Sequence, residues 1–231
     1  MIPSKVGADV SHMFASISGR YDLANSVLSF GVHHIWRRTL LRAVSGRHYK
    51  AALDLCTGTA DLVPLLLPLA EHVTGADFCE GMLVEGREKL KGLSPLRCSL
   101  ELADAMSLPY ADNRFDLLTV AFGVRNFENL ERGLNEIFRC MTPGGRLAVL
   151  EFGQPKGLFG QLYRQYSAHV LPVLGGILTG NRTAYGYLER TSQTFPCADR
   201  FTQKLLLAGF TETSFKSLTG GICYLYLAKK P

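Results

Sequence analysis

The sequence lacks the long hydrophobic runs, paired cysteines and leader segment that mark membrane-spanning or secreted proteins. Its longest apolar runs, 62–70 and 170–178, are about half of a membrane span and contain proline or glycine. Residues 1–10 have no apolar core, which argues against a signal peptide. The six cysteines are widely spaced and form no C-x-x-C pair, so we interpret them as buried thiols in a reducing compartment. These absences predict a globular protein of the cytoplasm.

Strong charge and metal-ligand spacing are also missing. The net charge of +5 is scattered, and no basic run is long enough to follow a phosphate backbone, so nucleic acid is not an expected partner. Among the six histidines only His33 and His34 are adjacent, and such neighbours do not easily bind one ion together, so no metal site is predicted. With 231 residues and 47% hydrophobic content, the chain predicts one large domain with room for an inserted lobe.

What the sequence does contain is an alternation of strand and helix patterns after Tyr49. Strands are expected at 51–56, 71–77, 98–103, 115–122 and 146–152, with a helix through Leu69, helices over 80–90 and 130–140, and a turn at 142–145. Their apolar runs are mostly continuous, which indicates a parallel sheet covered on both faces. A last helix over 199–208 and two strands joined at 218–221 predict an antiparallel hairpin at the sheet edge. The fold class is therefore α/β, Rossmann-like, with a seven-stranded, mostly parallel sheet.

Two helical segments lie outside this alternation. Residues 9–44 predict helices broken by a turn near Gly31, with Asp22 as a cap of the second helix. The basic cluster after Gly31 is either a solvated helix face or functional: His33, His34, Arg37 and Arg38. Residues 157–190 are aromatic and glycine-rich, and they form either a lid over a cleft or a plain packing lobe. We expect a single domain with an N-terminal helical extension at 1–47, a cofactor-binding core at 48–156, a helical lid insert at 157–190, and a C-terminal helix and hairpin at 191–231.

The stretch LDLCTGTAD, residues 53–61, carries the strongest ligand-binding signal. A buried strand ending at Asp54, a loop at Gly58 and a helix start near Asp61 direct backbone N–H groups towards a nucleotide-like ligand. Asp77 follows about twenty residues after the glycine, where a carboxylate accepts hydrogen bonds from both ribose hydroxyls. The loop has one glycine where a dinucleotide fingerprint has three, so a pyrophosphate approaches poorly. This points away from NAD and towards S-adenosylmethionine, whose adenosine carries no phosphate.

Ligands of such sheets bind at the carboxyl ends of the strands. Asp54, Asp77, Asp104 and the loop over 122–127 are therefore expected to point into one cleft.

Eight motifs carry a resemblance that covers nearly the full chain. In order they are MFASISGRYDLANSVLSFGVHHIWRR, LDLCTGTADL, GADFCEGML, LPYADNRFD, TVAFGVRNF, MTPGGRLAVLEF, YSAHVLPVLGG and LTGGICYLY. The sequence resembles the ubiquinone/menaquinone biosynthesis C-methyltransferases, and within them the demethylmenaquinone methyltransferase branch. The resemblance implies a class I S-adenosylmethionine-dependent methyltransferase that methylates a ring carbon of a prenylated quinol, converting demethylmenaquinol to menaquinol. A ubiquinone-pathway benzoquinol, or both quinols, is the alternative substrate.

The resemblance also implies the cofactor contacts. They fall on Gly58 and Thr59 in the glycine loop, on Asp77 at the ribose, and on Asp104 with Ala105 beside the adenine. The alternative for Asp104 is a plain turn residue.

The sequence departs from the family pattern at two positions. Ala121 stands where relatives often have a small hydroxyl residue, so one polar contact is missing. Ala60 stands where many relatives have glycine, which asks for a backbone conformation open to alanine. Neither departure removes the ribose or adenine contacts.

The implied reaction needs a nucleophilic ring carbon, and an ortho hydroxyl must lose its proton to make it so. A free phenol has a pKa near ~10, so the site must hold a base or stabilise the phenolate. The resemblance places Arg125 and Asn126 at that oxygen, and Tyr21 is a further donor from the N-terminal helices. For Arg125 the alternative is a salt bridge to a carboxylate such as Glu128.

Histidine is the alternative proton acceptor, because it titrates near neutral pH. His33 and His169 are the candidates. A lone histidine with apolar neighbours, such as His169, is more often a core residue.

The isoprenoid tail of the implied substrate predicts peripheral contact with the inner face of the membrane, through the segment 158–187 and Trp36 with its neighbouring arginines. A homo-oligomer is compatible with the sequence.

Three other functions compete with quinol methylation. A methyltransferase of another lipid-like molecule, such as a sterol, would share the cofactor half. A base-modifying enzyme would carry N/D-P-P-Y/F after the fourth strand, where this chain has FGVRNF. A non-catalytic partner in a biosynthetic complex is opposed by the presence of Asp77, Arg125 and Asn126.

Overall fold

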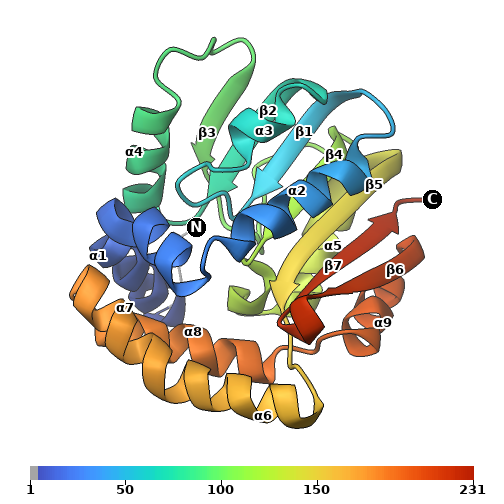
Figure 1. Ribbon diagram of the computed structural model, residues 1–231. Helices are drawn as coiled ribbons and strands as arrows, with labels where there is room; N and C mark the ends of the chain where they lie inside the picture. Colours follow the sequence, from blue (N-terminus) through green and yellow to red (C-terminus); the bar gives the residue numbers. More distant parts are fainter. Residues whose placement is uncertain (1–4) are drawn as a thin grey trace.

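The computed structural model describes residues 5–231, apart from the side chains of 5–9, 21 and 182–185 (Figure 1). One seven-stranded sheet has the order β3-β2-β1-β4-β5-β7-β6. The strands are β1 (Tyr49–Leu55), β2 (Ala70–Asp77), β3 (Cys98–Leu102), β4 (Phe115–Ala121), β5 (Met141–Phe152), β6 (Thr211–Leu218) and β7 (Cys223–Lys229).

The strand directions confirm the predicted mixed sheet. β1 pairs in parallel with β2 and β4, and β2–β3 and β4–β5 are also parallel. β7 is antiparallel to β5 and to β6, so the last hairpin forms the edge. All parallel strands therefore end on the same side of the sheet, where the loops that follow them can form a common site.

Helices cover both faces of the sheet, as continuous apolar strands require. On one face, α5 (Leu130–Cys140) and α9 (Asp199–Leu207) pack on Leu53 and Leu55. On the other face, α2 (Val32–Val44) and α3 (Val63–Leu66) pack on Ala52, and α4 (Glu80–Lys89) packs against β2 and β3. Successive residues of β1 thus enter opposite cores, because side chains alternate along a strand.

A third group of helices crosses the carboxyl ends of the parallel strands (Figure 1). It consists of α6 (Gly157–Gln165), the π-helix Tyr166–Val170, α7 (Leu171–Thr179) and α8 (Arg182–Thr194). The long N-terminal helix α1 (Lys5–Leu28) packs against both α4 and α7, and so joins this helical layer to the sheet. The layer closes the end of the sheet at which ligands are expected. Among the described helices, none has both the length and the apolar character that a bilayer crossing requires.

Four local expectations differ from the structure. The helix through Leu69 is only the short α3, because Pro64 can start a helix while Pro68 removes a donor one turn later. Asp22 lies inside α1 and caps no helix; Gly31, with φ of 73°, begins α2. The turn at 142–145 is an irregularity within β5, where the register with β4 shifts. Helix α8 continues to Thr194, past the expected boundary at residue 190.

Candidate active site

Two cavities, each of about 430 Å³, lie at the carboxyl ends of the parallel strands. One contains Asp77 and the other contains Arg125, and we name them the Asp77 cavity and the Arg125 cavity. Four residues line both: Cys56, Gly58, Ala121 and Phe122. The two cavities therefore meet at the loops that follow β1 and β4. A group bound in one can reach a group bound in the other at this junction.

Asp77 ends β2 and is buried at the floor of its cavity. Its Oδ2 accepts a hydrogen bond from Gly58 N at 2.8 Å, and its Oδ1 accepts one from Cys79 N at 2.9 Å. Burial raises the pKa of this carboxyl to about 6, against the opposing effect of those backbone donors. The carboxylate has lone pairs left for further donors, such as a pair of ligand hydroxyls.

Asp104 and Ala105 lie at the far end of the same cavity, after β3. Asp104 Oδ1 accepts from Met106 N at 2.9 Å, which makes it the turn residue that was the alternative reading. The turn nevertheless directs the segment 102–107 along the cavity wall. Most of the remaining wall is apolar, including Phe78, Met82 and Phe127, which suits a flat heterocyclic ring.

The glycine loop adopts a strained conformation. Cys56, Gly58 and Ala60 have φ of 58°, 57° and 63°. The expectation that position 60 is open to alanine is wrong, because its backbone is left-handed and favours glycine. The methyl group of Ala60 is fully buried, so its packing contacts offset part of the cost of this backbone conformation.

Thr59 faces away from the Asp77 cavity. Its hydroxyl donates to Asp22 Oδ1 at 2.8 Å and accepts from Lys89 Nζ at 2.8 Å. Lys89 also pairs with Asp22 and with Asp61, and Asp61 pairs with Arg37. The side chain of Thr59 therefore fastens the loop to α1 and α4, and only its backbone is free to contact a cofactor.

The Arg125 cavity is strongly aromatic. Phe122 and Phe152 contact each other with ring centroids 4.7 Å apart, and Trp36 packs against both. Tyr163 and Tyr166 reach the cavity from α6 and the π-helix. Such a lining fits a flat hydrophobic ring with few polar groups.

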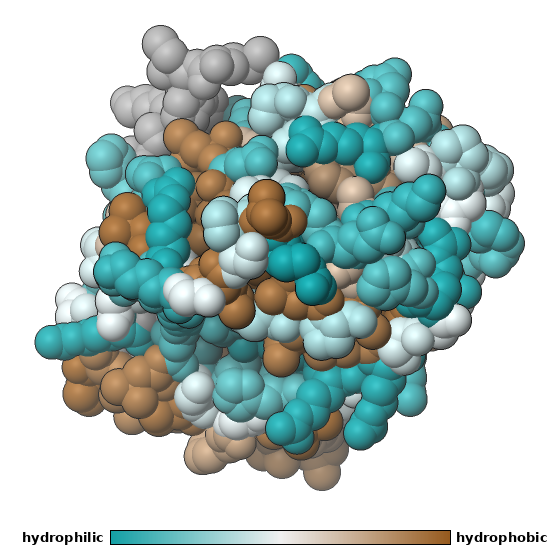
Figure 2. Space-filling model, turned by 90° about the horizontal axis from the view of Figure 1, so that it is seen from above, coloured by the Kyte–Doolittle hydropathy of each residue, from teal (hydrophilic) through white to brown (hydrophobic). Residues whose placement is uncertain are grey.

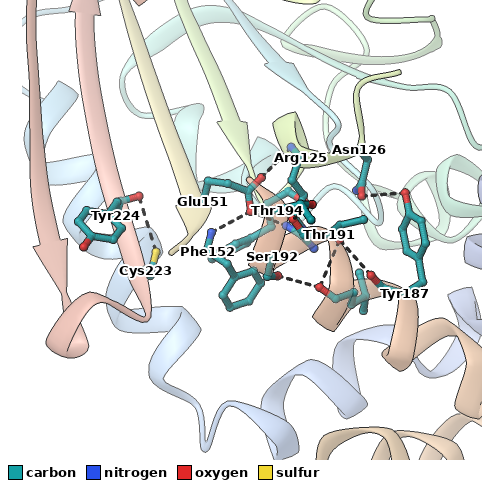
Figure 3. Close-up of polar contacts among 12 residues, drawn as sticks. Arg125, Asn126, Glu151, Phe152, Tyr187, Thr191, Ser192, Thr194, Cys223 and Tyr224 are labelled. Atoms are coloured by element: carbon teal, nitrogen blue, oxygen red, sulfur yellow. Dashed lines mark hydrogen bonds and ion pairs between the residues drawn. The ribbon is translucent and has the colours of Figure 1, made fainter. Parts of the chain in front are cut away.

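Arg125 lies on a short 3-10 helix after β4 and is almost fully buried, at 2% exposure. Its Nη1 donates to Glu151 Oε1 at 2.5 Å (Figure 3) and to Phe122 O at 2.7 Å. The predicted alternative of a salt bridge is thus present, but the partner is Glu151 at the end of β5. Among the described residues, none accepts from the buried Nε of Arg125. The guanidinium has five donors, so several remain for a ligand.

Asn126 belongs to the other cavity. Its Oδ1 accepts a hydrogen bond from the hydroxyl of Tyr187 on α8 at 3.3 Å (Figure 3). Arg125 and Asn126 therefore lie on opposite sides of the junction rather than side by side.

The other expected site residues fall in different places. His33 lines the Arg125 cavity. His169 is exposed on the π-helix and lines neither cavity. The side chain of Tyr21 lies outside the described residues, although its backbone is part of α1.

Two buried acids lie in the Arg125 region. Asp54 was expected to share one cleft with Asp77 and Asp104, but those two line the Asp77 cavity and Asp54 does not; Glu151 was not singled out from the sequence. Glu151, with 0% exposure, neutralises Arg125. Asp54 lines the cavity and accepts from the hydroxyls of Thr57 and Thr119 at 2.6 and 2.7 Å, while burial raises its pKa to about 6. For Glu151 the available signal was an acidic residue ending an otherwise apolar strand, RLAVLEF.

Comparisons with known proteins agree with this geometry. Residues 4–230 match the model of the ubiE/COQ5 methyltransferase family. The chain is 40% identical over 223 residues to the ubiquinone/menaquinone biosynthesis C-methyltransferase UbiE of Bdellovibrio bacteriovorus, covering 94% of each protein. It is 43% identical over 222 residues to the demethylmenaquinone methyltransferase of Thermus thermophilus, covering 95% of this chain and all of that one.

The fold is also found among solved structures. Phosphoethanolamine N-methyltransferase 2 of Haemonchus contortus, in complex with S-adenosyl-L-methionine, aligns with a TM-score of 0.66 at 12% identity. The alignment covers 85% of this chain and 52% of that chain, and at this identity it supports the fold alone. The sequence matches extend over nearly the whole length, and they show that this chain belongs to the ubiE/COQ5 methyltransferase family.

Proposed function

We propose that this chain transfers the methyl group of S-adenosylmethionine to a ring carbon of a prenylated quinol, and that demethylmenaquinol is its substrate. The observation that carries the proposal is the meeting of the two cavities at Cys56, Gly58, Ala121 and Phe122. A methyl donor in the Asp77 cavity and an aromatic ring in the Arg125 cavity would face each other there. The family and the names of the relatives supply the chemical class.

The Asp77 cavity fits the cofactor. Asp77 offers a buried carboxylate for two ribose hydroxyls. Gly58 has no side chain, so a ligand can approach its backbone closely. Asp104 and Ala105 border an apolar slot for the adenine. S-adenosylmethionine supplies an electrophilic methyl group. The residues of the chain would orient that group at the junction of the two cavities, whose walls are mostly apolar.

The Arg125 cavity fits the quinol. Its aromatic walls match a fused ring, and the donors left on Arg125 suit an oxygen that becomes negative as its proton leaves. Glu151 cancels the charge of the guanidinium, so a neutral quinol can enter without displacing a bare cation. A benzoquinol is the second candidate, because the Bdellovibrio relative is named for both the ubiquinone and the menaquinone pathways.

The tail of the quinol gives the helical layer a further role, peripheral contact with a membrane. Leu158 and Leu162 on α6, and Val173 and Ile177 on α7, are exposed and lie one turn apart on each helix. Phe30, 82% exposed, lines the Arg125 cavity. The face opposite this layer is mostly hydrophilic, with hydrophobic residues gathered along the lower border of the view (Figure 2). We name the four leucine, valine and isoleucine residues the apolar lid face.

Trp36, which was expected to belong to the membrane contact, is buried. Its Nε1 donates to Thr219 Oγ1 at 2.9 Å, and its ring packs on Phe122 and Phe152. Trp36 therefore belongs to the cavity wall and cannot contact a lipid surface.

The substrate is tested by single-turnover methyl transfer from labelled S-adenosylmethionine under anaerobic conditions. Reduced demethylmenaquinol and a benzoquinol analogue are supplied side by side. Label is expected in the naphthoquinol ring. Label in both rings would make the enzyme common to two pathways, and label in neither, with cofactor bound, would contradict quinol methylation.

Cofactor affinity is expected to fall as the pH drops through about 6. The raised pKa of Asp77 means that it is protonated below that pH, and a protonated carboxyl accepts fewer hydrogen bonds from the ribose. Asp77→Asn should weaken binding at pH 7.5 at least tenfold and remove most of the pH dependence between 5 and 7.5. Calorimetric titration at several pH values measures both. Asp104→Asn is the control, since it should keep the wild-type pH dependence; if it lost that dependence instead, the assignment to Asp77 would be wrong.

Replacing Arg125 is expected to separate turnover from cofactor binding. Arg125→Ala should lower single-turnover methyl transfer by about a hundredfold or more while S-adenosylmethionine still binds, as expected when transition-state stabilisation is lost. It also leaves the buried Glu151 without its cationic partner, although two backbone N–H groups still donate to it, and loss of such a partner typically destabilises by about 3–5 kcal/mol. The double variant Arg125→Gln, Glu151→Gln removes both charges and should recover stability but not turnover. Recovery of turnover in the double variant, or parallel loss of cofactor affinity, would assign Arg125 to folding.

The membrane contact is tested by sedimentation with anionic vesicles. Ile177→Asp and Leu162→Asp should release the protein from the vesicles, because each places a charge on the apolar lid face. Leu207→Asp is the matched control: Leu207 is 81% exposed but lies on α9. Failure of the wild-type protein to sediment, even with quinol in the vesicles, would contradict the contact.

A further inference from the structure

His33 differs from every other histidine of the described chain in its position. It occupies the first turn of α2, is 6% exposed and lines the Arg125 cavity. The next residue, His34, has an exposed side chain and lines neither cavity. The two rings are in contact, with centroids 3.9 Å apart, but only His33 borders the cavity.

The hydrogen bonds around His33 fix where its proton lies. Ser29 Oγ is 2.6 Å from Asn25 O and 2.6 Å from His33 Nδ1. A carbonyl oxygen only accepts, so the single hydroxyl proton of Ser29 is donated to Asn25. Ser29 must then accept from His33, which places a hydrogen on Nδ1. In a neutral ring Nε2 consequently carries a free lone pair, and among the described residues none bonds to it.

The surroundings keep the ring neutral. Burial lowers the pKa of His33 to about 4, helped by Arg37 and His34 on the same helix. Asp61 in the glycine loop and Asp22 on α1 act in the opposite direction but do not reverse the shift. The lone pair on Nε2 is therefore available throughout the neutral pH range.

We propose that His33 Nε2 is the proton acceptor for the hydroxyl next to the ring carbon that is methylated, held in position by Ser29 and Asn25. This inference rests on the proposed function. Asn25 and Ser29 line the same cavity as His33, so the whole chain of hydrogen bonds borders the quinol site. The arrangement is that of a base oriented by a second group.

The hydroxyl proton moves to Nε2, and the oxygen electron pair enters the ring. The ring carbon bonds to the methyl group, and the carbon–sulfur bond breaks to leave a neutral thioether. The hydrogen on the methylated carbon then leaves as a proton, while the oxygen recovers its proton from Nε2. One proton is released in total, and His33 returns to its neutral form.

A histidine with a low pKa cannot hold the proton before methyl transfer begins. It acts instead as a general base while charge develops, with the remaining donors of Arg125 stabilising the oxygen at the same time. The other ionisable groups nearby are less suited to accept the hydroxyl proton, because their atoms already have partners. Both oxygens of Asp54 accept threonine hydroxyls, and Asp61 pairs with Arg37 and Lys89.

The pH profile of His33→Asn tests the role. The amide of asparagine can donate to Ser29 as Nδ1 does, but nothing replaces Nε2. Turnover should fall about a hundredfold at pH 7, and the deficit should shrink below tenfold near pH 9.5, where the quinol loses its proton unaided. His48→Asn is the control: its side chain is exposed and lines neither cavity, so turnover should stay within twofold of wild type at every pH. An equal deficit for His33→Asn at all pH values would assign His33 to structure and overturn the proposal.

A second measurement does not need turnover. Nitrogen NMR of protein labelled in histidine should show His33 protonated at Nδ1 and bare at Nε2, with its signals assigned by their loss in His33→Asn. A 2,3-dimethylnaphthoquinol, which has no hydrogen at either carbon between the ring hydroxyls, should shift the Nε2 signal as it donates its hydroxyl. A proton on Nε2 in the free protein, or no shift at saturation, would overturn the proposal. If the shift appears but no quinol is methylated, the proposed function fails, and His33 is then a group that binds a quinol hydroxyl and not the base of a methyl transfer.

Discussion

The close approach of two loops at the end of the sheet governs the rest of the site. A Cβ at Gly123 would lie 2.3 Å from the Cβ of Cys56 and 2.6 Å from its sulfur, so the loops after β1 and β4 touch only because residue 123 is glycine. Both loops turn through left-handed backbone, at Cys56 and at Phe122, with φ of 58° and 61°. A bulky residue rarely adopts that conformation, and strain of this kind costs about 1–3 kcal/mol where it persists. The left-handed backbone of Phe122 directs its ring onto Trp36 and Phe152 and its carbonyl oxygen towards Arg125, which donates to it.

Ion pairs from α1, α2 and α4 hold the loop after β1 in place. Lys89 on α4 pairs with Asp22 on α1 and with Asp61 in the glycine loop, and Asp61 pairs with Arg37 on α2. These partly exposed pairs contribute modestly to stability one by one, but they share members and so fix three helices relative to one loop. The same arrangement holds α2 in the orientation that brings His33 to the cavity. In the proposed mechanism, cofactor binding and proton acceptance by His33 thus depend on the same set of ion pairs.

Much of the fold was predictable because its signals are local. Continuous apolar strands with helices between them indicate a covered parallel sheet, and the Leu218–Gly221 connection indicates the edge hairpin. Because ligands bind at the carboxyl ends of parallel strands, Asp54, Asp77, Asp104 and the loop over 122–127 were expected in one cleft. They do lie at that end of the sheet, but they divide between two adjoining cavities. What the sequence could not supply depends on distant contacts: that Glu151 pairs with Arg125, that Asp22 and Lys89 occupy the hydroxyl of Thr59, and that Arg125 and Asn126 face different cavities. The left-handed backbone of Ala60 was hidden for the same reason, since alanine carries no signal for it.

Two buried carboxyls with raised pKa values lie at the carboxyl ends of neighbouring strands, β1 and β2. Asp54 and Asp77 are each desolvated, and the charge of Asp77 raises the pKa of Asp54 further. A cationic methyl donor relieves this unfavourable burial of negative charge, because an opposite charge stabilises the ionised carboxyls. Once the methyl group has left, the sulfur is neutral and that relief disappears. If the cofactor binds beside Asp77 as proposed, these two carboxyls therefore favour the charged cofactor over the spent one.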